Sequence, residues 1–258
     1  MITALISRKG GVGKTTTAVN LSAALAARGR RTLLVDLDSQ ASASLSLGVA
    51  RGDLAPSSAD VMLGGLAASE AVRPTSVPNL DLITASADLV HADLELGPYR
   101  SREGRLRGAL AGIAQNYEFV LLDCPSSLSL VPINAVVAAD NFLVPMSPQF
   151  LAIAGVRNLL GAAERLGWDA NRRVVPLGLL LTLVDYRSKA TRRTVDEIRT
   201  EYGPLVFAIE IRVNTRLAEA PAAGQTIFQY DAGATGAKAY DLLADEFLLR
   251  AARFGVGS

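Results

Sequence analysis

A glycine-rich string at residues 8–16, RKGGVGKTT, lies between an apolar run at residues 2–6 and a helical pattern that begins near Ala18. Glycines before a helix let backbone amides converge on a polyphosphate without side chains in the way, and the helix dipole adds favourable partial charge. Lys14 can reach the β- and γ-phosphates, and the Thr15 hydroxyl can ligate Mg²⁺. The string therefore predicts a strand, a phosphate-binding loop and a helix that hold a nucleoside triphosphate. The residues expected to contact it are Lys9, Gly10, Gly11, Val12, Gly13, Lys14, Thr15 and Thr16.

Apolar runs rich in strand-forming residues recur along the chain, with helical patterns between them. We expect strands at residues 2–6, 32–35, 80–83, 119–122, 142–144, 177–183 and 206–209, and helices at residues 151–166, 191–202 and 237–252. Runs without polar alternation suit strands covered on both faces, and strands alternating with helices form βαβ units. The sequence therefore predicts an α/β fold with a doubly wound, mostly parallel sheet and helices on both faces. We expect residues 1–258 to form a single domain, with residues 51–78 as an irregular excursion.

Composition excludes several classes of protein. The chain has 258 residues, half of them hydrophobic, with one cysteine and a formal net charge of +1. One cysteine cannot form a disulfide within the chain, and no run approaches the ~18 apolar residues of a membrane span. A leader peptide is not expected either, so we expect a cytoplasmic protein. Because the net charge is near zero, any affinity for nucleic acid must come from a local basic patch.

Two carboxylates follow the expected strand at residues 32–35. Asp36 and Asp38 are two positions apart, which places them on one side of an extended segment. Ligands of open parallel sheets gather at the carboxyl ends of the strands, so both should face the crevice of the phosphate-binding loop. A plainer alternative is that an aspartate here only caps the following helix, and it carries more weight for Asp36 than for Asp38.

The expected strand at residues 119–122 delivers Asp123 to the same edge of the sheet. This pattern is typical of a Walker B strand, whose carboxylate can hold Mg²⁺ through a water molecule. The following segment at residues 125–127 is then placed to sense the terminal phosphate. Cys124 has no second cysteine with which to share an iron–sulfur cluster, so we interpret it as a packing residue.

Together these motifs resemble those of the ParA/MinD family of deviant Walker P-loop ATPases. Arg8 replaces the first glycine of the common P-loop, and Lys9 stands where this family has an additional lysine. The segments at residues 36–40, 180–185, 214–221 and 236–240 are similar to those of the ParA branch, so the resemblance covers nearly the whole chain. The family's usual proline is replaced at three positions, by Ser39, Ser126 and Arg212.

The resemblance implies a role for each motif. Lys9 is expected to reach the phosphates bound by a partner subunit, Lys14 to hold those of its own subunit, and Asp38 to orient or activate the attacking water. The residues expected around Mg²⁺ are Thr15, Asp36 and Asp123. Asn214 is expected beside the adenine of ATP. On physical grounds alone the same asparagine is a good helix N-cap, and this alternative is open.

Basic residues gather around the expected helix at residues 191–202. The candidate DNA-binding residues are Arg187, Lys189, Arg192, Arg193 and Arg216, and Arg212 adjoins them. Such a cluster neutralises phosphates without reading bases, which gives non-specific binding that weakens with salt. By charge alone, a solvated face paired with Asp196 and Glu197 is the better interpretation. The resemblance favours DNA, because ParA-like proteins bind it with basic residues in this region when ATP joins them into dimers.

The helix expected at residues 237–252 indicates whether the protein could bind a membrane. The MinD branch ends in a basic amphipathic helix that docks on anionic lipid. Here Asp241, Asp245 and Glu246 occupy the polar side, opposite an apolar stripe that includes Tyr240 and Phe247. Because carboxylates oppose binding to an anionic bilayer, we expect no membrane binding and a helix that faces the core.

The resemblance as a whole implies an ATP-dependent homodimer that binds non-specific DNA, associates with the nucleoid, and partitions or positions a plasmid, a chromosome or a protein assembly. A partner or cargo-adaptor protein is expected to accelerate its slow, Mg²⁺-dependent ATP hydrolysis. Two alternatives are open. One is a MinD-like, membrane-associated spatial regulator, and the other is a metabolic P-loop ligase that uses ATP to activate a carboxylate.

Overall fold

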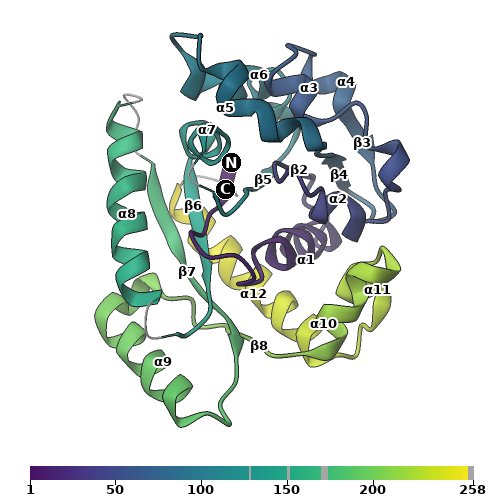
Figure 1. The fold of residues 1–258 in the computed structure, drawn as a ribbon. Coiled ribbons are helices and arrows are strands. Elements are labelled where there is room, and N and C mark those ends of the chain that lie inside the picture. The colour runs from purple at the N-terminus through teal and green to yellow at the C-terminus, as the bar shows by residue number, and fades with distance from the viewer. Residues whose placement is uncertain (128, 150–151, 170–173, 255–258) are drawn as a thin grey trace.

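An eight-stranded sheet forms the centre of the fold (Figure 1). The computed structural model describes residues 1–127, 129–149, 152–169 and 174–254. The strands are β1 (Ile2–Leu5), β2 (Thr32–Asp36), β3 (Val72–Pro74), β4 (Leu80–Ile83), β5 (Phe119–Asp123), β6 (Asn141–Met146), β7 (Val175–Val184) and β8 (Ile211–Arg212). They lie in the order β3-β4-β2-β5-β1-β6-β7-β8. Neighbouring strands are parallel except for the antiparallel pair β3–β4 at one edge.

Helices cover both faces of this sheet. They are α1 (Lys14–Ala27), α2 (Ser42–Ser46), α3 (Ser58–Met62), α4 (Ala68–Ala71), α5 (Ala92–Leu96), α6 (Arg105–Leu110), α7 (Leu130–Ala138), α8 (Ala152–Asp169), α9 (Lys189–Tyr202), α10 (Thr215–Glu219), α11 (Ile227–Tyr230) and α12 (Thr235–Ala251). Buried side chains of α1, α2 and α10 to α12 pack on one face, and those of α3 to α9 pack on the other. The doubly wound, mostly parallel α/β fold that the sequence predicts is therefore confirmed.

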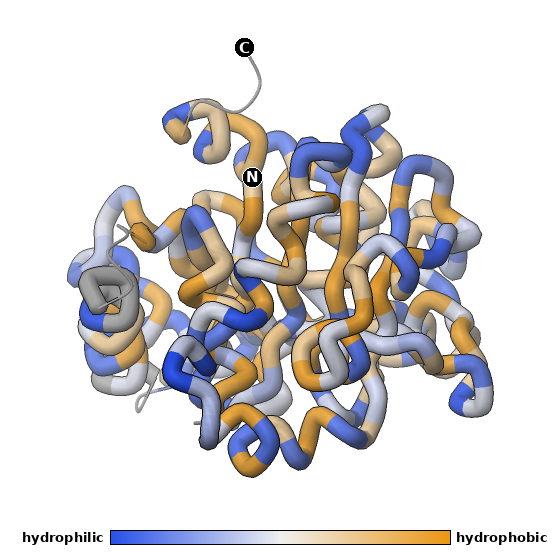
Figure 2. The backbone as a smooth tube through the Cα atoms, turned by 90° about the horizontal axis from the view of Figure 1, so that it is seen from above, coloured by the Kyte–Doolittle hydropathy of each residue, from blue (hydrophilic) through white to orange (hydrophobic). Residues whose placement is uncertain are grey.

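The strand β2 illustrates why the apolar runs lack polar alternation. Leu33 and Val35 belong to the core layer under α3 to α9, whereas Leu34 belongs to the layer under α1 and α12. Successive side chains of a strand point to opposite faces, so a strand covered on both faces buries every residue. In Figure 2 orange and tan stretches run through the middle of the molecule, and much of the blue lies towards its outer edge.

The C-terminal half departs from the sequence prediction at one strand. Residues 206–209 form no strand, and a single bridge between Leu179 and Val206 joins them to β7. Regular pairing resumes only at β8. Residues 51–78 are also more ordered than expected, because they contain α3, α4 and the edge strand β3.

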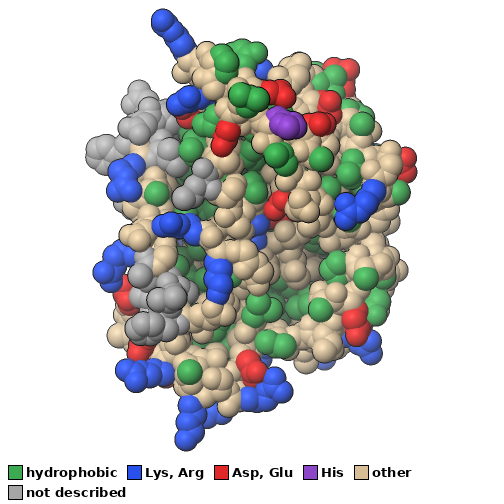
Figure 3. Space-filling model, in the orientation of Figure 1, with side chains coloured by type: hydrophobic (Ala, Val, Ile, Leu, Met, Phe, Trp, Pro, Cys, Tyr) green, Lys and Arg blue, Asp and Glu red, His purple; other side chains and the backbone are tan. Residues whose placement is uncertain are grey.

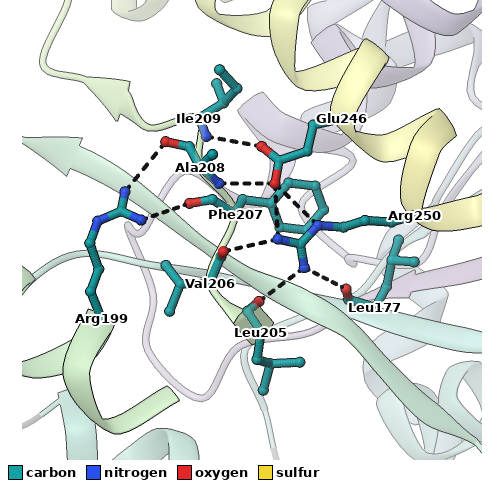
Figure 4. A network of polar contacts seen from close by, with 9 residues as sticks. All are labelled: Leu177, Arg199, Leu205, Val206, Phe207, Ala208, Ile209, Glu246 and Arg250. Carbon is teal, nitrogen blue, oxygen red and sulfur yellow. Dashed lines mark hydrogen bonds and ion pairs between the residues drawn. The ribbon is translucent and has the colours of Figure 1, made fainter. Parts of the chain in front are cut away.

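Side chains replace strand pairing along residues 205–209 (Figure 4). Arg250 of α12 donates to the backbone carbonyls of residues 177, 205 and 206 at 2.9–3.2 Å. Glu246 accepts the backbone amides of residues 208 and 209 at 2.9 and 3.0 Å. From the other side, Arg199 of α9 donates to the carbonyls of residues 207 and 208 at 3.2 and 3.4 Å. These bonds satisfy backbone groups that a strand would have satisfied by pairing.

This network corrects one expectation about the last helix. Glu246 was expected on its polar side, but its side chain is largely buried and bonds to the backbone. Asp241 and Asp245 do lie on the exposed side, where both pair with Arg28. Tyr240 and Phe247 are buried, as expected for a core-facing helix. None of the helices in the described ranges combines the length and the hydropathy that a membrane crossing requires.

Gly178 of β7 lies against this network and has no room for a side chain. A Cβ atom there would meet the Phe207 ring at 2.5 Å and a guanidinium nitrogen of Arg250 at 2.7 Å. We expect Gly178→Ala to lower the free energy of unfolding by about 1–3 kcal/mol, because both neighbours must move. Urea unfolding measures this change.

Gly155 of α8 provides the matched control, since a Cβ atom there meets nothing within 4 Å. Gly155→Ala should leave stability unchanged or raise it by up to about 1 kcal/mol, because alanine favours helix over glycine. Equal losses in the two variants would contradict the steric explanation.

Candidate nucleotide-binding site

The glycine-rich loop joins β1 to α1 at the carboxyl edge of the sheet. Gly11 and Gly13 have φ angles of 70° and 76°, a left-handed conformation that glycine adopts without steric cost. Thr182 of β7 fixes the loop, because its hydroxyl donates to the Val12 carbonyl at 2.6 Å. α1 begins at Lys14 with neither a side-chain cap nor an acidic residue in its first turn. The amides at this helix end are therefore available to a phosphate.

Lys14 and Asp123 are buried side by side next to the loop. Lys14 Nζ lies 3.6 Å from Asp123 Oδ1. Within the part of the chain that the structure describes, neither carboxylate oxygen of Asp123 accepts a hydrogen bond. Burial raises the pKa of Asp123, and the charge of Lys14 opposes this rise. The ammonium group of Lys14 offsets only part of the cost of burying this carboxylate, so the position fits a metal ion.

The donor set around Asp123 fits Mg²⁺ in particular. Thr15 follows Lys14 in the first turn of α1 and offers a hydroxyl oxygen. No group of three or more His, Cys, Asp and Glu side chains in the described ranges could hold a metal. Mg²⁺ seldom needs such a cage, because it keeps several waters and is commonly bound by one or two protein oxygens together with substrate phosphates. Thr15 and Asp123 are therefore the residues that would hold it.

Asp36 ends β2 in register with Asp123 of β5. Its Oδ2 accepts the Ser44 amide at 2.8 Å and the Ser44 hydroxyl at 2.7 Å, and its Oδ1 accepts the Asp38 amide at 3.1 Å. Burial, followed by the neighbouring charge of Asp123, raises the pKa of Asp36 to about 7. Asp36 therefore anchors the turn into α2, as the capping alternative describes. It also lies beside the candidate metal site.

Asp38 and Lys9 lie at the rim of the site. Asp38 is half-buried, and its Oδ1 accepts the Gln40 amide at 3.0 Å. Lys9 is exposed, and its ammonium group donates to the side-chain oxygen of Gln149, just beyond β6. Its carbonyl accepts the Ser126 hydroxyl at 3.4 Å. The backbone of Lys9 thus touches the segment at residues 125–127 that was expected to sense the terminal phosphate.

Asn214 is the N-cap of α10. Its Oδ1 accepts the Leu217 amide at 3.2 Å, and its Nδ2 donates to the Thr235 hydroxyl at 2.7 Å. The capping alternative thus describes the observed contacts of this side chain. A contact between Asn214 and adenine stays a prediction.

Four of the candidate DNA-binding residues lie on α9 or just before it, where Figure 3 shows blue side chains along the lower edge of the molecule, and the fifth, Arg216, lies on α10. Three of them pair with carboxylates: Arg187 with Asp185, Arg193 with Glu197, and Arg216 with Glu219 and Asp231. Arg192 donates to the Tyr186 carbonyl at 2.7 Å instead of pairing with Asp196. Arg212 stacks on the Tyr186 ring, with 5.1 Å between its guanidinium carbon and the ring centre. The surface formed by these residues is therefore basic, and neighbouring carboxylates neutralise part of its positive charge.

Sequence reasoning missed three side chains that support the site. Thr182 is the polar residue within an otherwise apolar strand, which is a signal that could have been noticed. Ser44 and Gln149 carry no such signal. Only the fold brings them to Asp36 and Lys9.

Comparison with known proteins identifies the family to which this geometry belongs. The chain is 39% identical over 251 residues to the chromosome partitioning protein ParA of Caulobacter vibrioides, covering 96% of this chain and 94% of that protein. It is 38% identical over 245 residues to the sporulation initiation inhibitor protein Soj of Bacillus subtilis, covering 95% and 97%. The chain belongs to the ParA family of P-loop ATPases. Residues 1–175 also match the family described as an AAA domain.

Solved structures agree with a ParA-family fold. Cobyrinic acid a,c-diamide synthase from Mycobacterium smegmatis with bound ADP and magnesium has a TM-score of 0.84 and 33% identity, over 98% of this chain and 96% of that chain. The cell division ATPase MinD of Pyrococcus furiosus has a TM-score of 0.77 and 26% identity, over 96% and 98%. The ParA/MinD resemblance that the sequence motifs suggest is thus confirmed, and this ParA-family chain is an ATPase.

The raised pKa of Asp36 predicts how stability depends on pH. The pKa of Asp36 is about 7 in the folded state, whereas an aspartate of the unfolded chain has its ordinary pKa of 3.8. Ionisation of Asp36 therefore favours the unfolded chain between these pH values. As pH rises through this window, the wild-type protein should lose up to about 4 kcal/mol of unfolding free energy relative to Asp36→Asn. Urea unfolding of the nucleotide-free proteins across pH measures the difference. A difference that does not change with pH would show that Asp36 is ionised throughout.

Proposed function

We propose that the protein is an ATP-dependent dimerisation switch whose residues 1–258 act as one ATPase domain. In its ATP state it binds non-specific DNA, and it partitions or positions a cargo. The observation that carries the proposal is the pair of lysines in the glycine-rich loop. Lys14 is buried beside Asp123 of its own chain, whereas Lys9 is exposed at the rim. An exposed second lysine can reach phosphates bound by another subunit once it leaves Gln149, so ATP would join two copies face to face.

The resemblance to ParA-like ATPases assigns each residue a role in hydrolysis, and the positions of the residues are compatible with these roles. The amides at the start of α1 and the Lys14 ammonium group bind the phosphates, and Thr15 and Asp123 hold Mg²⁺. Mg²⁺ held by these two residues would supply positive charge against the phosphate oxygens. Asp38, at the rim, orients the attacking water and accepts its proton. Asp36 keeps Asp38 in place, since its carboxylate accepts the Asp38 amide.

The relatives support a partitioning role for this switch. ParA of Caulobacter vibrioides is described as a chromosome partitioning protein, and the Soj protein of Thermus thermophilus, 41% identical over 247 residues, as a chromosome-partitioning ATPase. On the basic surface, Lys189 and Arg192 have no carboxylate partner among the ion pairs of the described residues. We expect these two to contribute most to DNA binding, because the other cations must first leave a carboxylate. A partner or cargo-adaptor protein would stimulate hydrolysis and release the DNA.

A metabolic amide synthase is the second candidate, and one observation favours it. The Mycobacterium smegmatis structure with a TM-score of 0.84 is described as a cobyrinic acid a,c-diamide synthase. Such an enzyme would turn over ATP rapidly only with its carboxylate substrate. Stimulation of ATP turnover by cobyrinic acid, and not by DNA or a partner protein, would favour this function. A MinD-like regulator would instead sediment with anionic liposomes in ATP.

Two substitutions separate nucleotide binding from turnover. Lys14→Ala should abolish ATP binding, because it removes the buried ammonium group beside the phosphate site. Asp38→Ala should leave ATP binding and dimerisation intact but lower the turnover rate by about 10²-fold or more, since it removes the group that orients the water. Equilibrium binding of a fluorescent ATP analogue, size-exclusion chromatography in ATP and phosphate release measure these steps. Normal hydrolysis by Asp38→Ala would show that another group orients the water.

Retention on non-specific duplex DNA tests the switch itself. The protein should be retained with ATP, not with ADP or without nucleotide, and retention should fall steeply as salt rises. Lys9→Ala should lose retention because it cannot join two subunits, and Arg192→Glu should lose it while still forming the dimer. Arg157→Ala is the control, since Arg157 is an exposed arginine of α8 whose partner is Glu201. No retention of a protein shown to be dimeric in ATP would rule out DNA as the ligand.

A further inference from the structure

A cavity lies between α7 and α8, next to the glycine-rich loop. The two helices cover the same face of the sheet (Figure 1), and the cavity has a volume of about 390 Å³. Ile6, which follows β1, and Pro125, which follows β5, also line it, so it lies at the carboxyl edge of the sheet. Small-molecule sites in proteins have volumes of about 300–1,000 Å³. The cavity is therefore large enough for a small organic molecule.

The inner surface of this cavity is apolar. The most buried of its lining residues are Ile6, Val136 and Ala163, which are 4%, 4% and 2% exposed. Ile133 of α7 and Leu159 of α8 also line it and are half-buried. An apolar ligand that covers such side chains gains about 25 cal/mol for each Å² of apolar surface removed from water. The cavity therefore suits a ligand with an apolar body.

The charged residues that line the cavity are both arginines. Arg8 precedes Lys9 in the glycine-rich loop, Arg165 belongs to α8, and both are exposed. No aspartate or glutamate stands among the described residues that line the cavity, and neither arginine takes part in an ion pair of the described residues. The hydroxyls of Ser127 and Ser129, 2.8 Å apart, add hydrogen-bonding groups. Two guanidinium groups without a carboxylate favour an anionic head group on the ligand.

The cavity shares a wall with the loop that carries Lys9. Ser7 lines the cavity, and its hydroxyl oxygen lies 3.4 Å from both the amide nitrogen and the carbonyl oxygen of Lys9. Because Arg8 is the chain neighbour of Lys9, an anion bound to Arg8 brings negative charge into the surroundings of the Lys9 ammonium group. Occupation of the cavity is thus linked to the lysine that is expected to reach the second subunit.

We propose that this cavity binds a small carboxylic acid with an apolar chain. The chain lies between α7 and α8, and the carboxylate pairs with Arg8 and Arg165. The bound acid opposes the ATP-dependent dimer, because its charge competes for Lys9 with the phosphates of the second subunit. This last step rests on the proposed function, whereas binding of the acid does not.

The size and charge of the cavity favour such an acid over other occupants. A helix with its side chains is about 10–12 Å across, so a second copy of this chain could place single side chains in this space but not a helix. A phospholipid would have to leave its bilayer to place a chain between two packed helices. An amine would meet two arginines. A free acid matches both the apolar interior and the basic mouth.

Decanoate serves as the probe, and decanol and decylammonium are matched ligands with the same chain. Isothermal titration calorimetry without nucleotide, below the concentrations at which these molecules form micelles, should show one site for decanoate. Decanol should bind at least about tenfold more weakly, and decylammonium should not bind, because the head group meets two guanidinium groups. High salt should weaken the binding of decanoate.

Two pairs of variants locate the site. Arg165→Gln should weaken decanoate binding by about tenfold. Arg157→Gln should not, since Arg157 is an exposed arginine of the same helix that pairs with Glu201. Ala162→Phe should abolish binding, because Ala162 lines the cavity and the added ring fills it. Asn158→Phe is its control, since Asn158 is exposed on α8 and does not line the cavity. Urea unfolding checks that each variant is folded, and Arg165→Gln tests the site independently of Ala162→Phe.

Size-exclusion chromatography in ATP tests the competition with the dimer. Saturating decanoate should lower the dimer fraction of the wild-type protein. It should not lower that of Ala162→Phe, which keeps the nucleotide site but has no room for the chain. An unchanged dimer fraction of the wild-type protein would overturn the competition.

Several outcomes would overturn the binding proposal. They are absence of decanoate binding, equal binding of decanol, and equal binding by the wild-type protein and Ala162→Phe. Sedimentation with phosphatidylglycerol vesicles that Ala162→Phe abolishes would assign the cavity to bilayer lipid, and loss of the ATP-dependent dimer in Ala162→Phe would assign it to a second copy. The calorimetry uses neither nucleotide nor DNA, so a failure of the cavity proposal is distinguishable from a failure of the switch.

Discussion

Two buried carboxylates that end neighbouring strands in the same register impose the main electrostatic constraint on this protein. Asp36 and Asp123 lie side by side, and the buried ammonium group of Lys14 lies 3.6 Å from Asp123. Like charges in a poorly solvated place cannot both ionise cheaply, so Asp36 retains a proton up to about pH 7. Hydrogen bonds from Ser44 and Asp38 stabilise the ionised form of Asp36, whereas neither carboxylate oxygen of Asp123 accepts a hydrogen bond within the described ranges. A cation that arrives with nucleotide phosphates would complete the site, which couples ligand binding to stability.

The parts of the chain that carry function are held at this site mainly by side chains bonded to backbone groups. Thr182 holds the glycine-rich loop, Asp36 holds the turn that bears Asp38, and Asp93 meets the start of α7. Such bonds fix a loop without extending the sheet into it. The loops therefore stay close to the edge where ligands gather.

Side chains bonded to backbone groups also hold the segment at residues 205–214, which is longer than these loops. Arg199 holds it from α9, and Glu246 and Arg250 hold it from α12. The segment then continues through β8 to Asn214, the cap of α10. The helix with the candidate DNA-binding residues and the segment expected near the adenine are thus tied to one stretch of backbone. Its close packing against Gly178 leaves little room for independent motion.

The sequence by itself determined the fold class and the phosphate-binding loop, because both rest on local patterns. Apolar runs covered on two faces indicate parallel strands, and glycines before a helix indicate a phosphate site. It also supplied Asp36, Asp38 and Asp123 as strand-end carboxylates. Only the tertiary structure decided that Asp36 is bonded to Ser44, that Arg250 and Glu246 hold residues 206–209 where regular strand pairing is missing, and that Gln149 meets Lys9. These contacts join residues with no shared periodicity, so they exist only once the sheet order has brought distant segments together.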